Sequence, residues 1–236
     1  MTVYGKVHSL FTGKVKTIGL PGASDKMDQE WQTGAFKEER NQAVFLSTNG
    51  FLGDECQDTK HHGGSEKAVF AYPLAHYDLW KVELDNEDIG PGGNGENLAV
   101  MHMDEDSVCI GDIYELGEAV IQVSQPRRPC WKPARRHRDL ELAKKIEQTG
   151  RTGWYFRVLQ EGKVRANDEF VLVERPSPEW SIGRMNEVLY HQKDNIGLLE
   201  NLRDSAFTPS SWVETINRLL KGEEIDDTKR HYGPNI

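Results

Sequence analysis

The residues best suited to chemistry lie around Cys130, in the run from Ile121 to Lys132. Apolar and polar residues alternate at the start of this run, which predicts a strand. Pro126 and Pro129 then exclude both a regular helix and a central sheet position, so Cys130 is expected in a stiff turn just past the strand end. Three cationic side chains surround the thiol: Arg127, Arg128 and Lys132. Cations favour the thiolate, which attacks substrates or binds soft metals, although a half-buried cysteine in a basic loop has the same local sequence.

Two glycine-dense loops could hold a ligand through their backbone. The first is His61-His62-Gly63-Gly64, followed by Lys67; glycines tolerate positive φ, so their N–H groups can form a nest for an anion. The second, residues 92–97, contains Gly95 and Asn97, whose amide can both donate to and accept from the edge of a heterocycle. It lacks the glycine spacing of a dinucleotide fingerprint and the Lys-Ser/Thr pair of a P-loop. Ordinary surface turns remain the alternative for both loops.

The cysteine pattern argues against both structural zinc and disulfides. Three cysteines are present, Cys56, Cys109 and Cys130, and no two of them form a C-x-x-C pair. A sparse, odd count is typical of a reducing compartment. The first residues lack the apolar core of a signal peptide, and no apolar run approaches the ~20 residues that a membrane-spanning helix needs. A cytoplasmic location is therefore expected.

Charge narrows the class of partner. The 236 residues carry a formal net charge of -9, which argues against a nucleic-acid polymer or a membrane surface as the main partner. A local basic pocket within such an acidic protein instead indicates a small anionic ligand.

The hydrophobic period changes at Pro176 and Pro178. Short alternating strands dominate before this break, and apolar residues repeat at helical spacing in three short segments after it. The predicted fold is mainly β with α, in three parts: a β domain over residues 1–175, a small three-helix domain over 176–225 and a mobile or docking tail over 226–236.

The β domain is expected to contain inserted helices and one long excursion. One helix is predicted to open at Pro73, and another to run from Asp139 to Gln148 or Thr149 and end at Gly150. Residues 21–42 are polar and rich in Gly, Asp and Lys, which indicates a surface excursion between strands.

Taken together, these stretches resemble the MOSC domain, a family named for the C-terminal domain of molybdenum cofactor sulfurase. The pieces are Gly53-Asp54, His62-Gly63-Gly64 with Lys67-Ala68-Val69, Gly95-Glu96-Asn97-Leu98, Gly111-Asp112 and Ser124-Gln125-Pro126-Arg127-Arg128-Pro129-Cys130. The last piece is highly specific, whereas the glycine motifs alone are not. Their order and spacing resemble the bacterial YiiM-like branch, which also carries a C-terminal three-α-helix domain, and the resemblance covers nearly the whole chain.

The resemblance implies a closed or nearly closed MOSC-type β-barrel that binds molybdenum cofactor, a pterin dithiolene with a phosphate and an oxo-molybdenum centre. Cys130 stands where the family places its cysteine ligand to molybdenum, and a soft thiolate suits that metal. The other implied cofactor-binding residues are Arg127, Arg128 and Lys67 toward the phosphate and pterin oxygens, His62 and Asn97 toward the pterin edge, and Gly63, Gly64, Gly95 and Ser124 beside them. Pyridoxal phosphate, another association of MOSC domains, is not expected here.

The related activity is reduction of N-hydroxylated compounds, including hydroxylamino-purine bases, which would detoxify such bases. The chain shows no flavin fingerprint and no Cys₄ iron–sulfur pattern, so a separate flavoprotein would supply the electrons. Two alternatives stay open: a non-catalytic carrier that delivers the cofactor, and a cysteine-dependent hydrolase or sulfur-transfer protein that uses Cys130 with His62. A homodimer is also left open.

Overall fold

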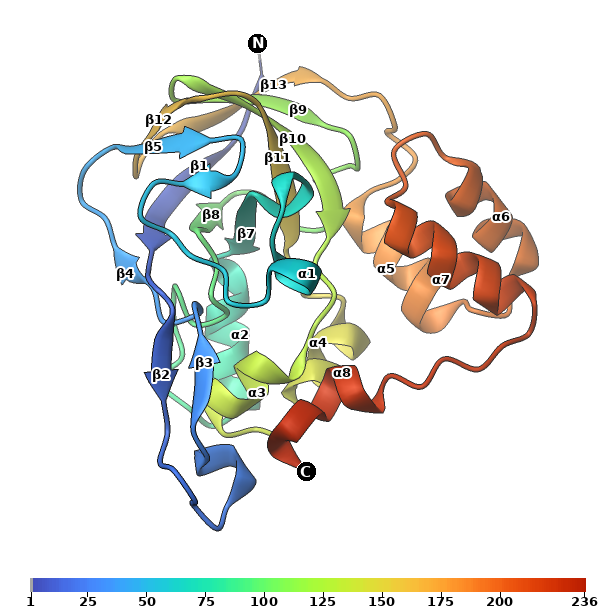
Figure 1. The fold of residues 1–236 in the computed structure, drawn as a ribbon. Helices are drawn as coiled ribbons and strands as arrows, with labels where there is room; N and C mark the ends of the chain where they lie inside the picture. Colours follow the sequence, from blue (N-terminus) through green and yellow to red (C-terminus); the bar gives the residue numbers. More distant parts are fainter. Residues whose placement is uncertain (1) are drawn as a thin grey trace.

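A closed β-barrel forms the centre of the molecule, as Figure 1 shows for the computed structural model, which describes residues 2–236. Its seven strands follow one another in the order β13 (Glu169–Glu174), β9 (Ile113–Leu116), β10 (Ala119–Pro126), β11 (Trp154–Gln160), β7 (Val69–Pro73), β8 (Leu98–Met101) and β1 (Thr2–Thr12). The sheet closes because β1 also pairs with β13. Only β7 and β8 are parallel neighbours, and helix α2 (Ala75–Glu83) forms part of the crossover that such a pair requires. The predicted barrel with inserted helices is thus confirmed.

Aromatic side chains fill the barrel. The rings of Phe156 and Phe170 are stacked with centroids 6.0 Å apart, and Tyr114 stands edge-on to both. All three residues are fully buried. Because burial of one large apolar side chain is worth about 1.5–3 kcal/mol, this packing contributes strongly to stability. The barrel interior is therefore a packed core, and a ligand must bind outside it.

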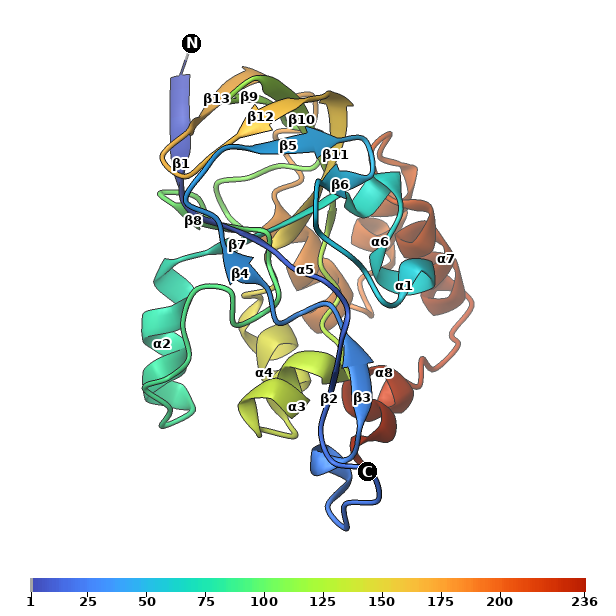
Figure 2. The same cartoon turned by 60° about the vertical axis from the view of Figure 1, so that its left-hand side comes forward.

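Smaller elements gather around the barrel. A hairpin of β2 (Lys16–Ile18) and β3 (Trp31–Thr33) extends away from it, and β4 (Glu38–Glu39) pairs with β1. A second sheet contains β5 (Val44–Ser47), β6 (Gly50–Phe51) and β12 (Gly162–Val164). Helices α3 (Trp131–His137) and α4 (Leu142–Thr149) lie at the end of the barrel from which the hairpin extends (Figure 2).

The start of helix α2 differs from the sequence prediction. Pro73 is the last residue of β7, paired with Val100, and the helix begins two residues later at Ala75. A proline is tolerated at this strand end because the next N–H, that of Leu74, donates to the carbonyl oxygen of Val100 at 2.8 Å. Pro73 therefore ends a strand and does not open a helix.

Helix α4 begins later than predicted but ends as predicted. It starts at Leu142, because the Asp139 carboxylate accepts from the N–H of Glu141 at 2.9 Å and so caps the turn before the helix. At the other end, Gly150 adopts a φ of +71°, the left-handed conformation that commonly terminates helices and favours glycine.

Three amphipathic helices follow the last barrel strand: α5 (Ile182–His191), α6 (Ile196–Asp204) and α7 (Ser210–Leu220). Ser181 caps α5, because its hydroxyl accepts from the N–H of Arg184 at 3.0 Å. Trp212 and Ile216 of α7 are fully buried and belong to the same hydrophobic cluster as the barrel residues. The helices therefore share one continuous core with the barrel. Within residues 2–236, no helix is both long enough and apolar enough to cross a membrane.

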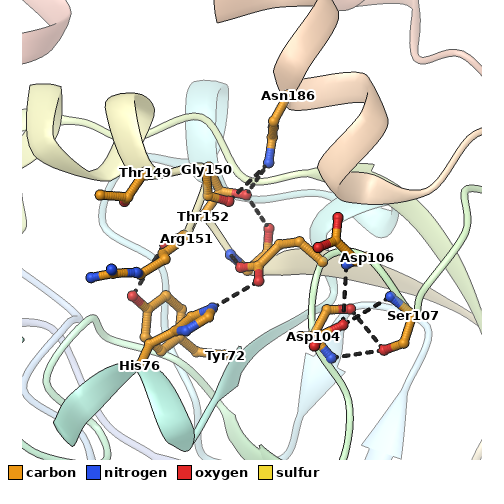
Figure 3. A network of polar contacts seen from close by, with 12 residues as sticks. Tyr72, His76, Asp104, Asp106, Ser107, Thr149, Gly150, Arg151, Thr152 and Asn186 are labelled. Atoms are coloured by element: carbon orange, nitrogen blue, oxygen red, sulfur yellow. Dashed lines mark hydrogen bonds and ion pairs between the residues drawn. The ribbon is translucent and has the colours of Figure 1, made fainter. Parts of the chain in front are cut away.

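Polar contacts also join α5 to the barrel (Figure 3). The amide nitrogen of Asn186 donates to Thr152 Oγ1 at 2.9 Å. The buried carboxylate of Glu105 accepts from the N–H of Gly153 at 2.7 Å and bonds to His76 Nε2 at 2.7 Å. Because a buried polar group is costly to leave unpaired, these bonds fix α2, α5 and the start of β11 relative to one another.

The last residues pack against α3. Helix α8 (Thr228–Tyr232) and the 3-10 turn η3 (Gly233–Asn235) lie beside α3 and α4 in both views (Figures 1 and 2). His231 and Asn235 are buried, so this end of the chain is a docked part of the fold.

Candidate functional site

Cys130 lies where strand β10 is followed by helix α3. Its backbone is extended (φ −138°, ψ 173°), it occupies the N-cap position of α3, and 7% of its surface is exposed. The sequence pattern did not predict this helix, which begins at Trp131, so only a short turn follows Pro126. Pro133 does not break the helix, because it is the third helical residue, whose N–H would have no partner within the helix.

The surroundings of Cys130 favour its thiolate. Burial raises the pKa of this thiol, but the charge and hydrogen bond of the His62 imidazole oppose burial. The Arg127 guanidinium and the backbone N–H of Lys132 act in the same direction, and together these groups lower the pKa of Cys130 to about 6. At neutral pH the sulfur is therefore an anion that can bind a soft metal or attack an electrophile.

The first glycine-dense loop lines a cavity next to this sulfur. His62 is the last residue of helix α1 (Thr59–His62), and its Nδ1 lies 3.4 Å from the hydroxyl of Tyr155. Lys67 Nζ donates to the carbonyl oxygen of His61 at 2.7 Å, and burial lowers the pKa of Lys67. The predicted site residues of this loop that line the cavity are His62, Gly63, Gly64 and Lys67.

Arg127 holds a buried positive charge beside the cavity. Only 4% of the residue is exposed, and the guanidinium lies 5.0 Å from the centroid of the Phe70 ring. Its Nη1 atom has no hydrogen-bond partner within residues 2–236. Because an unpaired buried donor costs free energy, this nitrogen indicates a place for an acceptor on a bound ligand.

Arg128 lies away from the cavity, contrary to the role that the resemblance implied. It precedes Pro129, which restricts it to an extended backbone, and consecutive side chains of extended chain point to opposite sides. Arg128 Nη1 donates to Thr215 Oγ1 of α7 at 3.2 Å, and Nη2 lies 3.7 Å from Asp227. Arg127 alone of this pair therefore faces the cavity.

Ser124 also lies outside the cavity lining. It is fully buried in β10, and its hydroxyl donates to the carbonyl oxygen of Glu66 at 2.5 Å and lies 3.1 Å from that of Tyr155. Glu66 belongs to the 3-10 turn η2 (Ser65–Lys67). Ser124 therefore connects this turn to the barrel and lies outside the cavity lining.

The second loop reaches the cavity through Gly95 and Asn97. The side-chain oxygen of Asn97 accepts from the N–H of Phe70 at 3.0 Å, and its amide nitrogen donates to Asp54 at 2.8 Å and to the carbonyl oxygen of Phe11 at 3.3 Å. Because protein groups occupy both amide hydrogens, Asn97 positions the loop and its side chain has no free donor for the edge of a heterocycle, although the sequence suggested one.

Glu96, for which the sequence predicted no role, organises the second loop. Its buried carboxylate accepts from the hydroxyl of Tyr77 at 2.5 Å and from the N–H groups of Gly92 and Asn94 at 2.6 and 3.1 Å. Burial raises the pKa of Glu96. A carboxylate directly after a glycine-dense run was the one sequence signal for such a loop-closing role.

The polar excursion of residues 21–42 contributes to the site, which its sequence did not indicate. Lys37 forms a largely buried ion pair with Asp54 on the cavity lining. Arg136 of α3 donates to the carbonyl oxygens of Ala35 and Gly92, each at 2.7 Å. These contacts join segments far apart in the chain, so no local spacing could reveal them.

Together these side chains enclose a cavity of about 510 Å³. Its lining carries five cationic side chains, Lys37, Lys67, Arg127, Lys132 and Arg136, and two carboxylates, Asp54 and Glu55. An excess of positive charge in a protein of net charge -9 suits a small anion. Across residues 2–236, three or more His, Cys, Asp or Glu side chains nowhere gather as a metal site.

The other two cysteines differ in their relation to this cavity. Cys56 lines it, and partial burial raises the pKa of its thiol. Cys109 lies outside the lining, with its sulfur 3.7 Å from the carbonyl oxygen of Pro178, and burial raises its pKa to about 11. Cys109 is therefore a matched control for substitutions at Cys130, whereas Cys56 is not.

One family model and several known proteins resemble this chain. The model of the MOSC domain matches residues 58–171. The uncharacterized protein YflK of Bacillus subtilis (strain 168) is 39% identical over 221 residues, which cover 92% of this chain and 97% of YflK. A protein named reductase from Gibberella moniliformis is 37% identical over 190 residues, which cover 79% of this chain and 32% of that protein. The crystal structure of YiiM from Geobacillus stearothermophilus has a TM-score of 0.75 and 35% identity, covering 92% of this chain and 99% of that one.

Proposed function

Because this chain belongs to the MOSC domain family, we propose that it binds molybdenum cofactor and reduces N-hydroxylated compounds such as hydroxylamino-purine bases. The observation that carries the proposal is the Cys130 thiolate beside a positively charged cavity. The relative named reductase supports redox chemistry in general. The electrons would come from a separate flavoprotein. The reaction would take place in the cytoplasm, where thiols stay reduced.

The cavity fits such a cofactor in size, charge and donor chemistry. Its volume of about 510 Å³ lies within the range of about 300–1,000 Å³ typical of small-molecule sites. Cys130 offers a soft thiolate ligand, while Arg127 with its unpaired Nη1 and Lys67 offer charged donors for a phosphate. When bound, the cofactor would supply the metal centre that passes electrons to the substrate.

The chain's own residues would handle protons and exclude water. Reduction of R–NH–OH takes up two electrons and two protons and yields R–NH₂ and water. His62 lines the cavity beside Cys130, and an imidazole is a side chain that can pass a proton to a bound substrate. The buried rings of Phe70 and Tyr155 form apolar parts of the wall and keep bulk water from that side.

Metal analysis and X-ray absorption test this function directly. Protein made with a working cofactor pathway should contain molybdenum with one sulfur ligand more than the two dithiolene sulfurs. Cys130→Ser should lose that sulfur, because serine is a harder ligand and a much weaker acid, and its reductase activity should fall to background. Cys109→Ser is the matched control and should behave like the parent. A parent spectrum with dithiolene sulfurs alone, or undiminished activity of Cys130→Ser, would falsify the assignment.

Two other functions would use the same cavity. A carrier would hold the cofactor but would not reduce hydroxylamino-purines after loading. The pairing of Cys130 with His62 also fits a cysteine-dependent hydrolase or sulfur-transfer protein. That function requires a covalent adduct on Cys130 without metal, which mass spectrometry of the metal-free protein would detect.

A further inference from the structure

A second groove, of about 640 Å³, lies where the end of α4, the loop of residues 104–106 and helix α5 meet. Its described lining residues all differ from those of the cavity beside Cys130. The acidic residues of the lining are Asp104, Glu105, Asp106 and Glu187, and the arginines are Arg151 and Arg184. This site is called the α4–α5 groove below.

One face of helix α5 borders this groove. Gly183, Asn186 and Glu187 are three and four positions apart, so they lie on the same side of the helix. The acidic loop packs against the start of this face, because a Cβ on Gly183 would collide with the Asp106 carboxylate. The N–H of Gly183 also donates to the carbonyl oxygen of Glu105 at 2.6 Å. The acidic loop and Asn186 are therefore held beside the same groove.

Asn186 carries an acceptor that is not used by any protein group within residues 2–236. Only 1% of this residue is exposed, and its Nδ2 donates to the carbonyl oxygen of Gly150 at 3.2 Å and to Thr152 Oγ1 at 2.9 Å (Figure 3). Exchanging the two amide atoms would set Oδ1 against the Gly150 carbonyl oxygen, so the hydrogen bonds fix this orientation. The buried Oδ1 has no partner. Because an unpaired buried acceptor costs free energy, Oδ1 indicates a donor on a bound ligand.

The two helix ends at the groove favour a cation over an anion. The N-terminus of α5 would attract an anion, but the N–H groups of residues 182–184 all donate to protein acceptors, at 2.6 to 3.0 Å. The carbonyl end of α4 reaches the groove at Gln148 and Thr149, and such an end carries a partial negative charge.

The acidic groups of the loop repel one another. Partial burial raises the pKa of Asp106, and the carboxylates of Asp104 and Glu105 raise it further. Arg151 does not offset this charge, because its Nη1 pairs at 2.8 Å with Glu83, outside the groove. A cation beside the loop would relieve the repulsion. Across residues 2–236, three or more His, Cys, Asp or Glu side chains nowhere gather as a metal site, which favours an organic cation.

We propose that the α4–α5 groove binds a small organic cation of the polyamine class, in which one ammonium group donates to Asn186 Oδ1 while Asp106 and Glu187 balance the charge. An ammonium group has N–H donors for the buried oxygen, and an alkyl chain with several such groups matches carboxylates that stand on both the loop and α5. The groove is also larger than a single ammonium ion requires. Binding here does not depend on the function proposed for the cavity beside Cys130.

Calorimetric titration of the full-length protein with putrescine at low salt tests the site. Putrescine should bind with one-to-one stoichiometry. Its analogue with methyl groups in place of every amine hydrogen keeps both charges but has no N–H donor, so it should bind about ten-fold more weakly, because Asn186 Oδ1 stays unpaired. Equal affinities for the two compounds would overturn the proposal.

Two charge variants change the affinity in opposite directions. Asp106→Asn should weaken putrescine binding about five-fold, and Arg184→Gln, which removes a like charge from the lining, should strengthen it about three-fold. A folding defect cannot produce tighter binding. The matched controls are Glu200→Gln and Arg203→Gln, which change the net charge equally on α6, outside the groove. Both controls should keep the parent affinity.

Asn186→Ala removes the acceptor itself and should abolish binding. This variant also loses the bonds to Gly150 and Thr152, so if it does not fold, the methylated analogue and the charge variants decide. Absence of a binding signal with putrescine, or equal changes in the groove and control variants, would show that the groove is not a polyamine site. Binding of Mg²⁺ alone as tight as that of putrescine would replace the organic cation by a hydrated metal ion and so overturn the proposal.

Discussion

Replacing Cys130 by serine is expected to lower stability only above about pH 6. In the folded protein the pKa of Cys130 is lowered to about 6, against 9.0 for an unperturbed cysteine. Between these values the unfolded chain binds a proton at this site and the folded chain does not, so the stability of the parent rises with pH. Below pH 6 both states carry the neutral thiol and the gain is lost. Serine stays neutral throughout and has no such gain.

The size of the effect follows from the pKa difference. Each pH unit between the folded and unfolded pKa values contributes about 1.4 kcal/mol to the free energy of unfolding. The parent should therefore exceed Cys130→Ser by about 4 kcal/mol above pH 9 and by about 2 kcal/mol near pH 7.5, with almost no difference below pH 6. Such a difference is a large part of the about 5–15 kcal/mol that stabilises a typical domain.

Urea unfolding of the cofactor-free proteins, in reductant and at several pH values, measures this difference. Cys109→Ser is the control: because burial raises the pKa of Cys109 to about 11, its difference from the parent should stay constant up to about pH 9. If the difference between the parent and Cys130→Ser is the same at every pH, the sulfur is not a thiolate at neutral pH. The metal-ligand role proposed for Cys130 would then lose its physical basis.

Two further changes to the chain, a substitution and a truncation, have clear expected outcomes. Arg127→Ala should reduce cofactor retention about ten-fold or more, because a charge-assisted hydrogen bond is worth about 1.5–3 kcal/mol. Arg128→Ala is the matched control and should retain the cofactor as the parent does. Molybdenum content after gel filtration measures both variants, and equal losses would contradict the assigned directions of the two side chains. A chain that ends at Arg175 should still unfold cooperatively but at a lower urea concentration, because it loses the helices that share the barrel core; a broad transition without cooperativity would show that the barrel does not fold alone.

The sequence predicted those features of the fold, such as strands and helix ends, that depend on residues close together in the chain. Alternation of apolar residues indicated the strand before Cys130, and prolines placed the cysteine just past its end. Gly150 ends α4 as predicted, because such a helix end depends on one dihedral angle. Helix α3 was not predicted, because prolines normally exclude a helix. These prolines lie before the helix or in its first turn, where a backbone N–H would have no partner within the helix.

The cavity lining could be predicted only in part, because the sequence shows residue types but not the direction in which each side chain points. The loop from His62 to Lys67 was found, because glycine and histidine types mark it in the chain. Arg127 and Arg128 have the same local chemistry, and only the path of the extended backbone decides which of them faces the cavity.

The sequence by itself determined the types of residue at the site: a thiol among cations, and glycine-dense loops. It also determined that the rest of the protein is acidic, which makes the excess of positive charge at the site informative. Only the tertiary structure decided which groups are free to bind. The amide of Asn97 is occupied by Asp54 and Phe11, which lie far from it in the chain, and the backbone around Cys130 is held by residues that follow it by about a hundred positions. The physical reason is that hydrophobic period and turn chemistry act over a few neighbouring residues, whereas a hydrogen bond between distant segments exists only once the packed core has brought them together.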